Sequence, residues 1–331
     1  MTGIEGSSEC PARTRDAGRN RLRRPADQVT VMKIGFSTLV CPAWDLPTAI
    51  AQAAALGYAG IEIRGLKGEF DLLRCAALAG NPGLAKKAFA DAGIELIGLS
   101  PSVTLDSKKR SRLDESRRTL VEHIELAGQL GCPYVKLFAG EVQRFDHHDA
   151  ALSRIARELN ELVPTAVKHG VTLLIENTGD FTRSEDLWYL LDAVSHPAVQ
   201  CCWNQTNAGT RREFPSVSIP RLGIRIAVSH ICDADFDETG VLKAYKLPGE
   251  GQVGVTRQIE LLRGVGHEGW LVFEWPKAWL PDLPDPSAAL PAVAQFLKAE
   301  LSKKQVVLSA YKGDKNAAKF AAKTSVSVPS P

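Results

Sequence analysis

The sequence predicts a single α/β domain that folds as a closed (β/α)8 barrel, the TIM barrel architecture. Eight short runs rich in β-branched residues recur along the chain, and each is followed by a helical pattern or a loop. This alternation favours parallel pairing of the strands, and eight such units in about 270 residues fit a closed barrel. A doubly wound open sheet is the alternative. It usually has a glycine-rich phosphate-binding turn after its first strand, whereas residues 37–42 here read Ser-Thr-Leu-Val-Cys-Pro.

The expected elements follow one another in a regular order. A helical stretch ends near a glycine, and a β-branched run begins within a few residues. Apolar residues in the helical stretches recur at helical spacing, as do Leu120, Ile124 and Ala127. The expected strands span residues 33–38, 60–64, 94–99, 134–138, 171–176, 199–203, 223–230 and 270–274. The clearest helices span residues 46–56, 113–130, 149–169, 184–194 and 255–265.

Charge is unevenly distributed along the 331 residues, although the formal net charge is only +2. Residues 1–31 carry +2 and residues 298–331 carry +5, so the stretch between them carries −5. We expect the barrel to span residues 32–303, with disordered basic extensions at 1–31 and 304–331. Met32, directly before the first strand, is a candidate start of the native chain. A nucleic-acid partner is not expected, because its site would need a basic surface on the barrel itself.

Composition and cysteine usage indicate a globular protein of a reducing compartment. Hydrophobic residues make up 44% of the chain and charged residues 24%, which is ordinary for a globular domain. No apolar run reaches the roughly 18 residues of a membrane span, and the first residues lack the order of a secretory signal. The seven cysteines are scattered and odd in number, which favours free thiols. We therefore expect a cytoplasmic protein with no membrane partner, and homo-oligomer formation stays open.

Four of the expected strands end in polar residues. Glu176 ends the fifth strand, Asn204 follows the sixth, His230 ends the seventh and Glu274 ends the eighth. Period-two alternation places Glu176 on the same face as Leu174, and the carboxyl ends of barrel strands form one rim. We therefore expect two carboxylates, an imidazole and an amide oxygen to converge there. Such ligands suit a divalent ion, namely Mn²⁺, Mg²⁺, Co²⁺ or Zn²⁺.

Five short segments carry a resemblance to a known family. They are Gly60-Ile-Glu-Ile-Arg64, Ile175-Glu-Asn177, His230-Ile-Cys-Asp233, Leu247-Pro-Gly-Glu-Gly-Gln-Val253 and Gly269-Trp-Leu-Val-Phe-Glu-Trp275. On these segments the chain resembles the sugar phosphate isomerase/epimerase group of the xylose isomerase-like TIM barrel superfamily. The resemblance covers nearly all of residues 32–301, and the Pro-Gly-Glu-Gly turn with the following Gly-Trp-Leu-x-x-Glu is its most specific part.

The resemblance implies roles for the polar strand ends. It implies four metal ligands, of which the two glutamates also form the acid–base pair: Glu176, Asn204, His230 and Glu274. Two departures stand out. The family often has Asp-x-x-His where this chain has Asn204-Gln-Thr-Asn207, and His-x-Lys-Asp where this chain has Cys232 in place of the lysine. The first departure removes one negative charge from the site, so a degenerate site without catalysis stays open.

Four further residues are candidates for substrate contact. Glu62 lies on the second expected strand, at a position that family members often keep near the substrate; a rim ion pair is the alternative. Lys136, between apolar residues of the fourth strand, could bind a hydroxyl, phosphate or carboxylate if it faces inward. Asn207 and Glu250 complete the set, and Glu250 could instead order its turn.

The leading hypothesis is a metal-dependent isomerase or epimerase of a small sugar or related polyhydroxy carbonyl compound. One glutamate would remove the proton next to the carbonyl and the other would return it, through a metal-stabilised enediolate. A dehydratase of the inosose type uses the same proton abstraction and is the first alternative. A non-catalytic sugar-binding barrel is the second. Phosphodiester cleavage, as in related apurinic endonucleases, ranks low because only seven histidines are present and none lies on the second or third strand.

Overall fold

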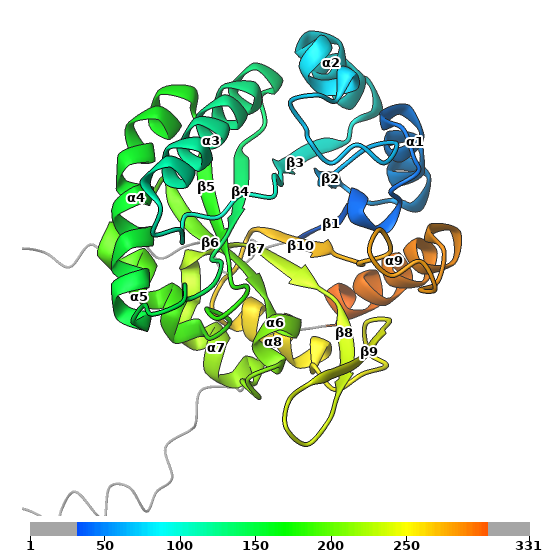
Figure 1. The fold of residues 1–331 in the computed structure, drawn as a ribbon. Helices are drawn as coiled ribbons and strands as arrows, with labels where there is room; N and C mark the ends of the chain where they lie inside the picture. Colours follow the sequence, from blue (N-terminus) through cyan, green and yellow to red (C-terminus); the bar gives the residue numbers. More distant parts are fainter. Residues whose placement is uncertain (1–31, 304–331) are drawn as a thin grey trace, which may run out of the picture. The chain divides into compact units, whose positions relative to one another are not determined.

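The computed structural model describes residues 32–303, which form a closed barrel of parallel strands (Figure 1). The predicted (β/α)8 barrel is therefore confirmed. The predicted extensions at 1–31 and 304–331 lie outside the described residues. Around the barrel the strands follow the order β1-β10-β7-β6-β5-β4-β3-β2. Their bounds are β1 Lys33–Ser37, β2 Gly60–Ile63, β3 Glu95–Leu99, β4 Tyr134–Phe138, β5 Thr172–Glu176, β6 Val199–Asn204, β7 Ile226–Ile231 and β10 Trp270–Phe273.

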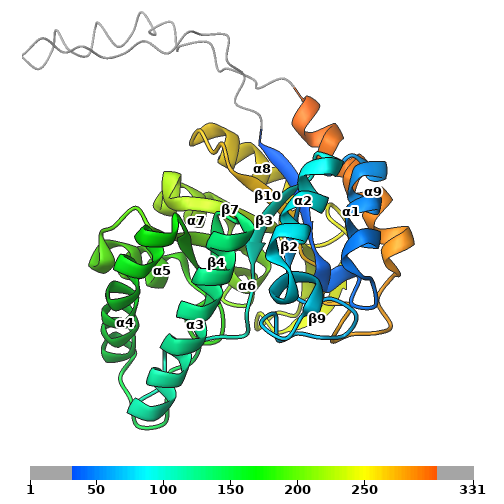
Figure 2. The same ribbon diagram turned by 90° about the horizontal axis from the view of Figure 1, so that it is seen from above.

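Helices surround the barrel on its outer side (Figures 1 and 2). Gly131 and Gly170 end α3 and α4 in the left-handed conformation, with φ of 69° and 67°, which an L side chain rarely adopts. This is why strands begin shortly after glycines. The bounds are α1 Leu46–Leu56, α2 Pro82–Ala92, α3 Arg110–Leu130, α4 His148–His169, α5 Ser184–Val194, α6 Gln205–Gly209, α7 Pro215–Leu222, α8 Val255–Gly264 and α9 Pro286–Ser302. The ranges predicted for α1 and α5 agree with the structure residue for residue.

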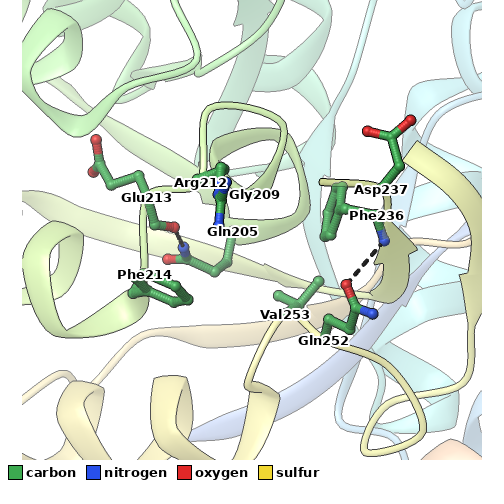
Figure 3. A pocket seen from close by; sticks show the side chains of 9 residues that line it. All are labelled: Gln205, Gly209, Arg212, Glu213, Phe214, Phe236, Asp237, Gln252 and Val253. Carbon is green, nitrogen blue, oxygen red and sulfur yellow. Dashed lines mark hydrogen bonds between the residues drawn. The ribbon is translucent and has the colours of Figure 1, made fainter. Parts of the chain in front are cut away.

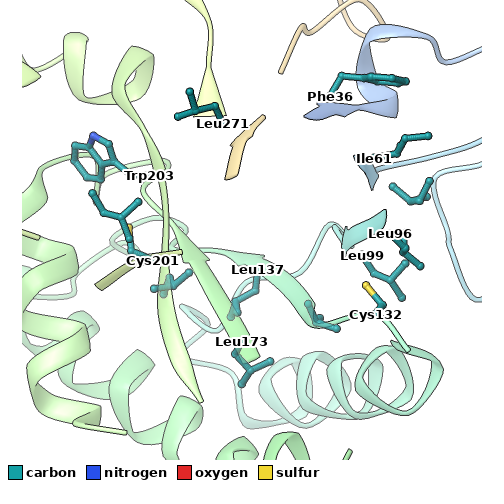
Figure 4. Close-up of a cluster of buried hydrophobic side chains, with 14 of the residues drawn as sticks. Phe36, Ile61, Leu96, Leu99, Cys132, Leu137, Leu173, Cys201, Trp203 and Leu271 are labelled. Carbon is teal, nitrogen blue, oxygen red and sulfur yellow. The ribbon is translucent and has the colours of Figure 1, made fainter. Parts of the chain in front are cut away.

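Alternation along the strands separates two apolar clusters. One lies inside the barrel and includes Leu174, Val228 and Val272, as the predicted shared faces require. A Cβ on Gly60 would come within 2.7 Å of the Trp270 ring, so the indole can occupy this position only because residue 60 has no side chain. The other cluster lies between the sheet and the helices, and Figure 4 shows part of it: Phe36, Ile61, Leu96, Leu99, Cys132, Leu137, Leu173, Cys201, Trp203 and Leu271.

A hairpin outside the barrel follows β7 and was not predicted. It consists of β8, Asp233–Phe236, and β9, Leu242–Lys246, which pair in antiparallel fashion. Its strands are short and polar, so hydropathy alone does not mark them. The Asp233 carboxylate is buried and accepts backbone N–H groups of Gly249, Gly251 and Val253 at 2.9–3.0 Å. This side chain therefore ties the hairpin to the Pro-Gly-Glu-Gly turn.

Replacing Asp233 by Ala is expected to lower the free energy of unfolding by about 2–3 kcal/mol, because several buried N–H groups lose a charged acceptor. Urea unfolding measures this change. Asp235→Ala is the matched control, since that carboxylate pairs at 3.5 Å with Lys246 on the surface and should contribute under about 1 kcal/mol. Equal effects of the two substitutions would contradict the anchoring role of Asp233.

Among the described residues, no helix is long and apolar enough to cross a membrane.

Candidate active site

Six polar side chains meet inside the barrel at the carboxyl ends of the strands. They come from β2, β4, β5, β6 and β7 and from the residue that follows β10, so barrel closure alone brings them together. Five of them are at most 4% exposed, and the side chain of the sixth, Glu274, is 15% exposed. Every residue of the predicted metal site is among them, and so are two of the predicted substrate contacts: Glu62, Lys136, Glu176, Asn204, His230 and Glu274.

The Lys136 ammonium lies among three carboxylates. Its Nζ is 2.7 Å from Glu176 Oε2 and 3.5 Å from both Glu62 Oε1 and Glu274 Oε1. Burial opposes a charge on the lysine, but attraction to Glu176, Glu62 and Glu274 outweighs it and raises the pKa of Lys136 well above its usual value. Lys136 therefore faces inward and carries a positive charge into the centre of the site.

His230 bridges the same carboxylates from the opposite side. Its Nδ1 lies 3.3 Å from Glu176 Oε1 and 3.2 Å from Glu274 Oε2, and its Nε2 lies 3.2 Å from Glu62 Oε2. Burial alone would lower the pKa of the imidazole, but the neighbouring Cys202, Glu274 and Glu176 raise it well above its usual value. For Glu62, burial raises the pKa, but Lys136 and His230 more than offset this and bring it to about 2. The pKa of Glu176 is lowered in the same way.

Asn204 presents its amide nitrogen to the centre of the site. Its Nδ2 donates to Glu176 Oε1 at 3.0 Å and to Glu274 Oε2 at 2.9 Å. Its Oδ1 accepts the backbone N–H of Thr206 at 3.1 Å and caps the N-terminus of α6. The cap determines which end of the amide faces inward, because only oxygen can accept those N–H groups. In this orientation Asn204 is a hydrogen-bond donor to the two glutamates.

Three of the predicted ligands fit a divalent ion. One donor atom from each of Glu176, His230 and Glu274 lies within 4.8 Å of the other two. The separations of 3.3 and 3.2 Å from His230 Nδ1 match the roughly 3.0–3.4 Å between neighbouring ligands of an ion with bonds of about 2.1 Å. Asn204 does not fit as oriented, since its oxygen is engaged in the helix cap. The site thus contains three candidate carboxylate and imidazole ligands, with Lys136 beside them.

A cavity of about 180 Å³ opens onto this cluster. Asn207 lines it and donates through Nδ2 to the Asn177 carbonyl at 2.8 Å. Glu250 does not reach it: this side chain is exposed and lines a separate cavity between the Pro-Gly-Glu-Gly turn and α9. The walls of the central cavity are completed by Leu39, Arg64, Phe138, Thr178, Thr206, Cys232, Tyr245, Pro276 and Trp279.

Arg64 and Tyr245 are among the lining residues to which the sequence analysis assigned no role. Arg64 stands two residues after Glu62, and period-two spacing is the signal that could have found it. Tyr245 belongs to β9, so it could not be placed without the hairpin. Trp279, considered as a pocket wall or a cap of the barrel, does line the cavity.

A second cavity, of about 140 Å³, lies between the α6–α7 segment and the hairpin (Figure 3). Gln205 donates to the Glu213 carbonyl at 2.7 Å on one side, and Gln252 accepts from the Phe236 backbone at 3.1 Å on the other. Its charged lining residues are Arg212, Glu213 and Asp237, and none of them belongs to a described group of side chains that could hold a metal ion. The first cavity, which opens onto such a group, is therefore the candidate site.

The fold agrees with the family comparison. Residues 50–300 match the xylose isomerase-like TIM barrel family. The chain belongs to that family, and the resemblance found in the sequence is confirmed. No curated protein matches the chain.

Several solved structures share the fold at low sequence identity. A 3-keto-D-glucoside 4-epimerase from E. coli is 15% identical with a TM-score of 0.66, over 81% of this chain and 99% of that one. A D-psicose 3-epimerase from Clostridium cellulolyticum H10 is 16% identical with a TM-score of 0.66, over 81% and 98% of the two chains. An L-ribulose 3-epimerase is 17% identical with a TM-score of 0.66, over 89% and 98%. At these identities the likeness concerns the fold.

Proposed function

We propose that this protein is an isomerase or epimerase of a small sugar or related polyhydroxy carbonyl compound. The observation that carries the proposal is the pair Glu176 and Glu274, which face one cavity at the carboxyl ends of β5 and β10 and share the donors Lys136, His230 and Asn204. Two carboxylates that face one cavity are the arrangement required to remove a proton on one side and return one on the other. The sugar epimerases that share the fold are consistent with this class.

Proton transfer next to a carbonyl creates negative charge on the substrate oxygens. In the proposed reaction one of the two glutamates takes the proton and the other delivers a proton to the same or the adjacent carbon. The Lys136 ammonium and the Asn204 amide are fixed donors inside the barrel, so they can stabilise the enediolate with little reorganisation. A substrate aligned in the cavity also excludes water from these groups.

A divalent ion would be held by Glu176, His230 and Glu274. When bound, such an ion supplies Lewis-acid polarisation of the substrate carbonyl. His230 has to lose its proton to become a ligand, so metal affinity is expected to rise with pH. Mn²⁺, Mg²⁺, Co²⁺ and Zn²⁺ all accept this ligand set.

A dehydratase of the inosose type is the second candidate. The raised pKa of His230 keeps an acid beside both glutamates, and that acid could protonate a leaving hydroxyl. Loss of water from the product, seen by mass spectrometry, separates this outcome from isomerisation.

The test is solvent exchange with a panel of ketoses. D-Psicose, D-tagatose and L-ribulose are incubated with the protein and Mn²⁺ in D₂O, and NMR follows deuterium uptake at the carbons next to the carbonyl. Enzyme-dependent uptake with an epimeric or isomeric product supports the proposal. If neither these sugars nor their acid and phosphate forms show uptake, the proposal fails.

Replacing Asn204 by Asp is expected to tighten Mn²⁺ binding by about one order of magnitude or more. The substitution adds a unit charge beside the ion, and a unit charge about 4 Å away is worth roughly 4 kcal/mol at an effective dielectric near 20, before desolvation is subtracted. Without metal the variant should be less stable than the parent, because a fourth carboxylate of the site then replaces the amide that donates to Glu176 and Glu274. Titration calorimetry of the parent and the variant with Mn²⁺ measures the change, and equal or weaker binding by the variant would show that a charge at position 204 does not act on the ion.

A further inference from the structure

Arg64 is a buried cation whose hydrogen-bonding capacity is only partly used. It follows β2, is 6% exposed and lines the central cavity beside Glu176, Asn204 and Glu274. One terminal nitrogen donates to Ser102 Oγ at 2.5 Å. The other, Nη1, is buried and has no hydrogen-bond partner among the described residues. Buried donors are rarely left without a partner, so the unpaired nitrogen points to a ligand.

Aromatic rings hold the guanidinium in place. The rings of Phe70, Phe138 and Trp279 lie with their centroids 5.7–5.8 Å from the Arg64 Cζ. Phe70 and Trp279 also pack on each other at 4.6 Å. Such packing immobilises the guanidinium and leaves its N–H edge available for a planar acceptor.

The charge of Arg64 is not neutralised by a direct neighbour. The carboxylates of Glu274, Glu62 and Glu176 attract it, but no described carboxylate forms a salt bridge with it. Glu62 and Glu176 are instead engaged by Lys136 and His230. Arg64 therefore lacks a directly paired carboxylate, and the carboxylate of a ligand can accept its unpaired N–H groups.

We infer that Arg64 binds the carboxylate of an anionic substrate, so that the protein acts on keto sugar acids in preference to neutral ketoses. This inference rests on the proposed function, since it names the substrate class of the same site. The same cavity is lined by Glu176 and Glu274, which repel a carboxylate. The substrate is therefore oriented with its acid group at Arg64 and its carbonyl at the two glutamates.

A carboxylate fits the surroundings of the Arg64 guanidinium better than a phosphate does. The free Nη1 edge and the adjacent nitrogen offer parallel donors, which match the two oxygens of a carboxylate. The rings of Phe70, Phe138 and Trp279 also lie next to the guanidinium. A phosphate would bring a third charged oxygen toward these rings.

The experiment uses three ketoses that differ at one carbon. D-Fructose, D-fructuronate and D-fructose 6-phosphate carry a hydroxymethyl, a carboxylate and a phosphorylated hydroxymethyl at the same end, and the tagatose series repeats the set. Titration calorimetry with the full chain is expected to show the acid binding at least about tenfold more tightly than the neutral sugar. Deuterium uptake is measured on the same samples.

Variants locate the effect at Arg64. Arg64→Gln is expected to weaken binding of the acid by about tenfold or more and binding of the neutral sugar by no more than about twofold. Arg64→Lys keeps the positive charge but not the paired N–H donors of the guanidinium. Its affinity for the acid should therefore lie between those of the parent and Arg64→Gln. Arg225→Gln is the matched control, because Arg225 precedes β7 at the opposite end of the barrel and pairs with Asp192.

The outcomes separate this inference from the proposed function. Deuterium uptake with equal binding of acid and neutral sugars overturns the inference and leaves the proposed function intact. Arg64-dependent binding of the acid without uptake supports the inference and overturns the proposed function. Tighter binding of the phosphate than of the acid, or binding of no compound, overturns the inference. If Arg64→Gln does not fold, the affinities of the parent chain for the three sugars still test whether the acid is preferred.

Discussion

Glu176→Gln and Glu274→Gln are each expected to lower kcat on any accepted substrate by about 10²-fold or more, with the barrel still folded. Gln keeps the shape of the side chain but cannot take or return a proton, and general acid–base catalysis of this kind contributes roughly 10²–10⁴-fold. Each variant leaves Lys136 with two of its three carboxylates, so the charge at the centre stays partly neutralised. Steady-state kinetics and the deuterium uptake assay measure the loss.

Two measurements keep this result interpretable. Glu95→Gln is the matched control, because Glu95 lies on β3, pairs with Lys33 at the other end of the strands and is exposed. Titration with Mn²⁺ shows whether the variants lose metal as well as activity, since both glutamates are proposed ligands. Near-normal turnover by either variant would refute the acid–base assignment.

Lys136→Met is expected to lower the free energy of unfolding by about 3–5 kcal/mol, which is the usual result of removing one partner from a buried ion pair. For a domain of this size the melting temperature should fall by roughly 10 °C. The reason is that Glu62, Glu176 and Glu274 are then left close together without their shared cation. Thermal unfolding in the presence of a chelator measures the change.

The pH dependence of this destabilisation is its second signature. In the parent the pKa of Glu62 lies near 2, below that of an unfolded glutamate, so its contribution to stability is present above about pH 4.3 and is lost as the pH falls toward 2. Without Lys136, burial is expected to dominate and to raise the pKa of Glu62 and Glu176. The folded variant then takes up protons more readily than the unfolded chain. The loss in its free energy of unfolding relative to the parent should therefore become smaller as the pH falls from 8 to 5.

Lys33→Met provides the comparison for Lys136→Met. The Lys33 and Glu95 side chains are 46% and 55% exposed, and exposed pairs contribute about 0–1 kcal/mol. Urea unfolding at several pH values compares the two variants. A small, pH-independent loss for Lys136→Met would show that the lysine does not neutralise the three carboxylates.

Local pattern alone determined the architecture. The elements whose signal is strong over a few residues, such as the helix at 46–56 and the strand at 134–138, are placed by the sequence at the same bounds as in the structure. The inward direction of Glu176, His230 and Glu274 also follows from the sequence, because alternation relates them to Leu174, Val228 and Val272 in the barrel interior. The hairpin was missed because its short polar strands lack this signal.

Tertiary structure decided what these side chains do to one another. Glu62 and His230 are 168 residues apart and meet across the interior at 3.2 Å, a distance that only closure of the barrel determines. The amide of Asn204 turns its nitrogen inward because α6 begins at that point and requires an oxygen as its cap. Glu250 was predicted as a substrate contact, yet the turn that Asp233 anchors carries it to another cavity. Burial and charge at the site thus depend on neighbours from distant strands, whereas the periodicity that specifies each strand depends on the nearest residues along the chain.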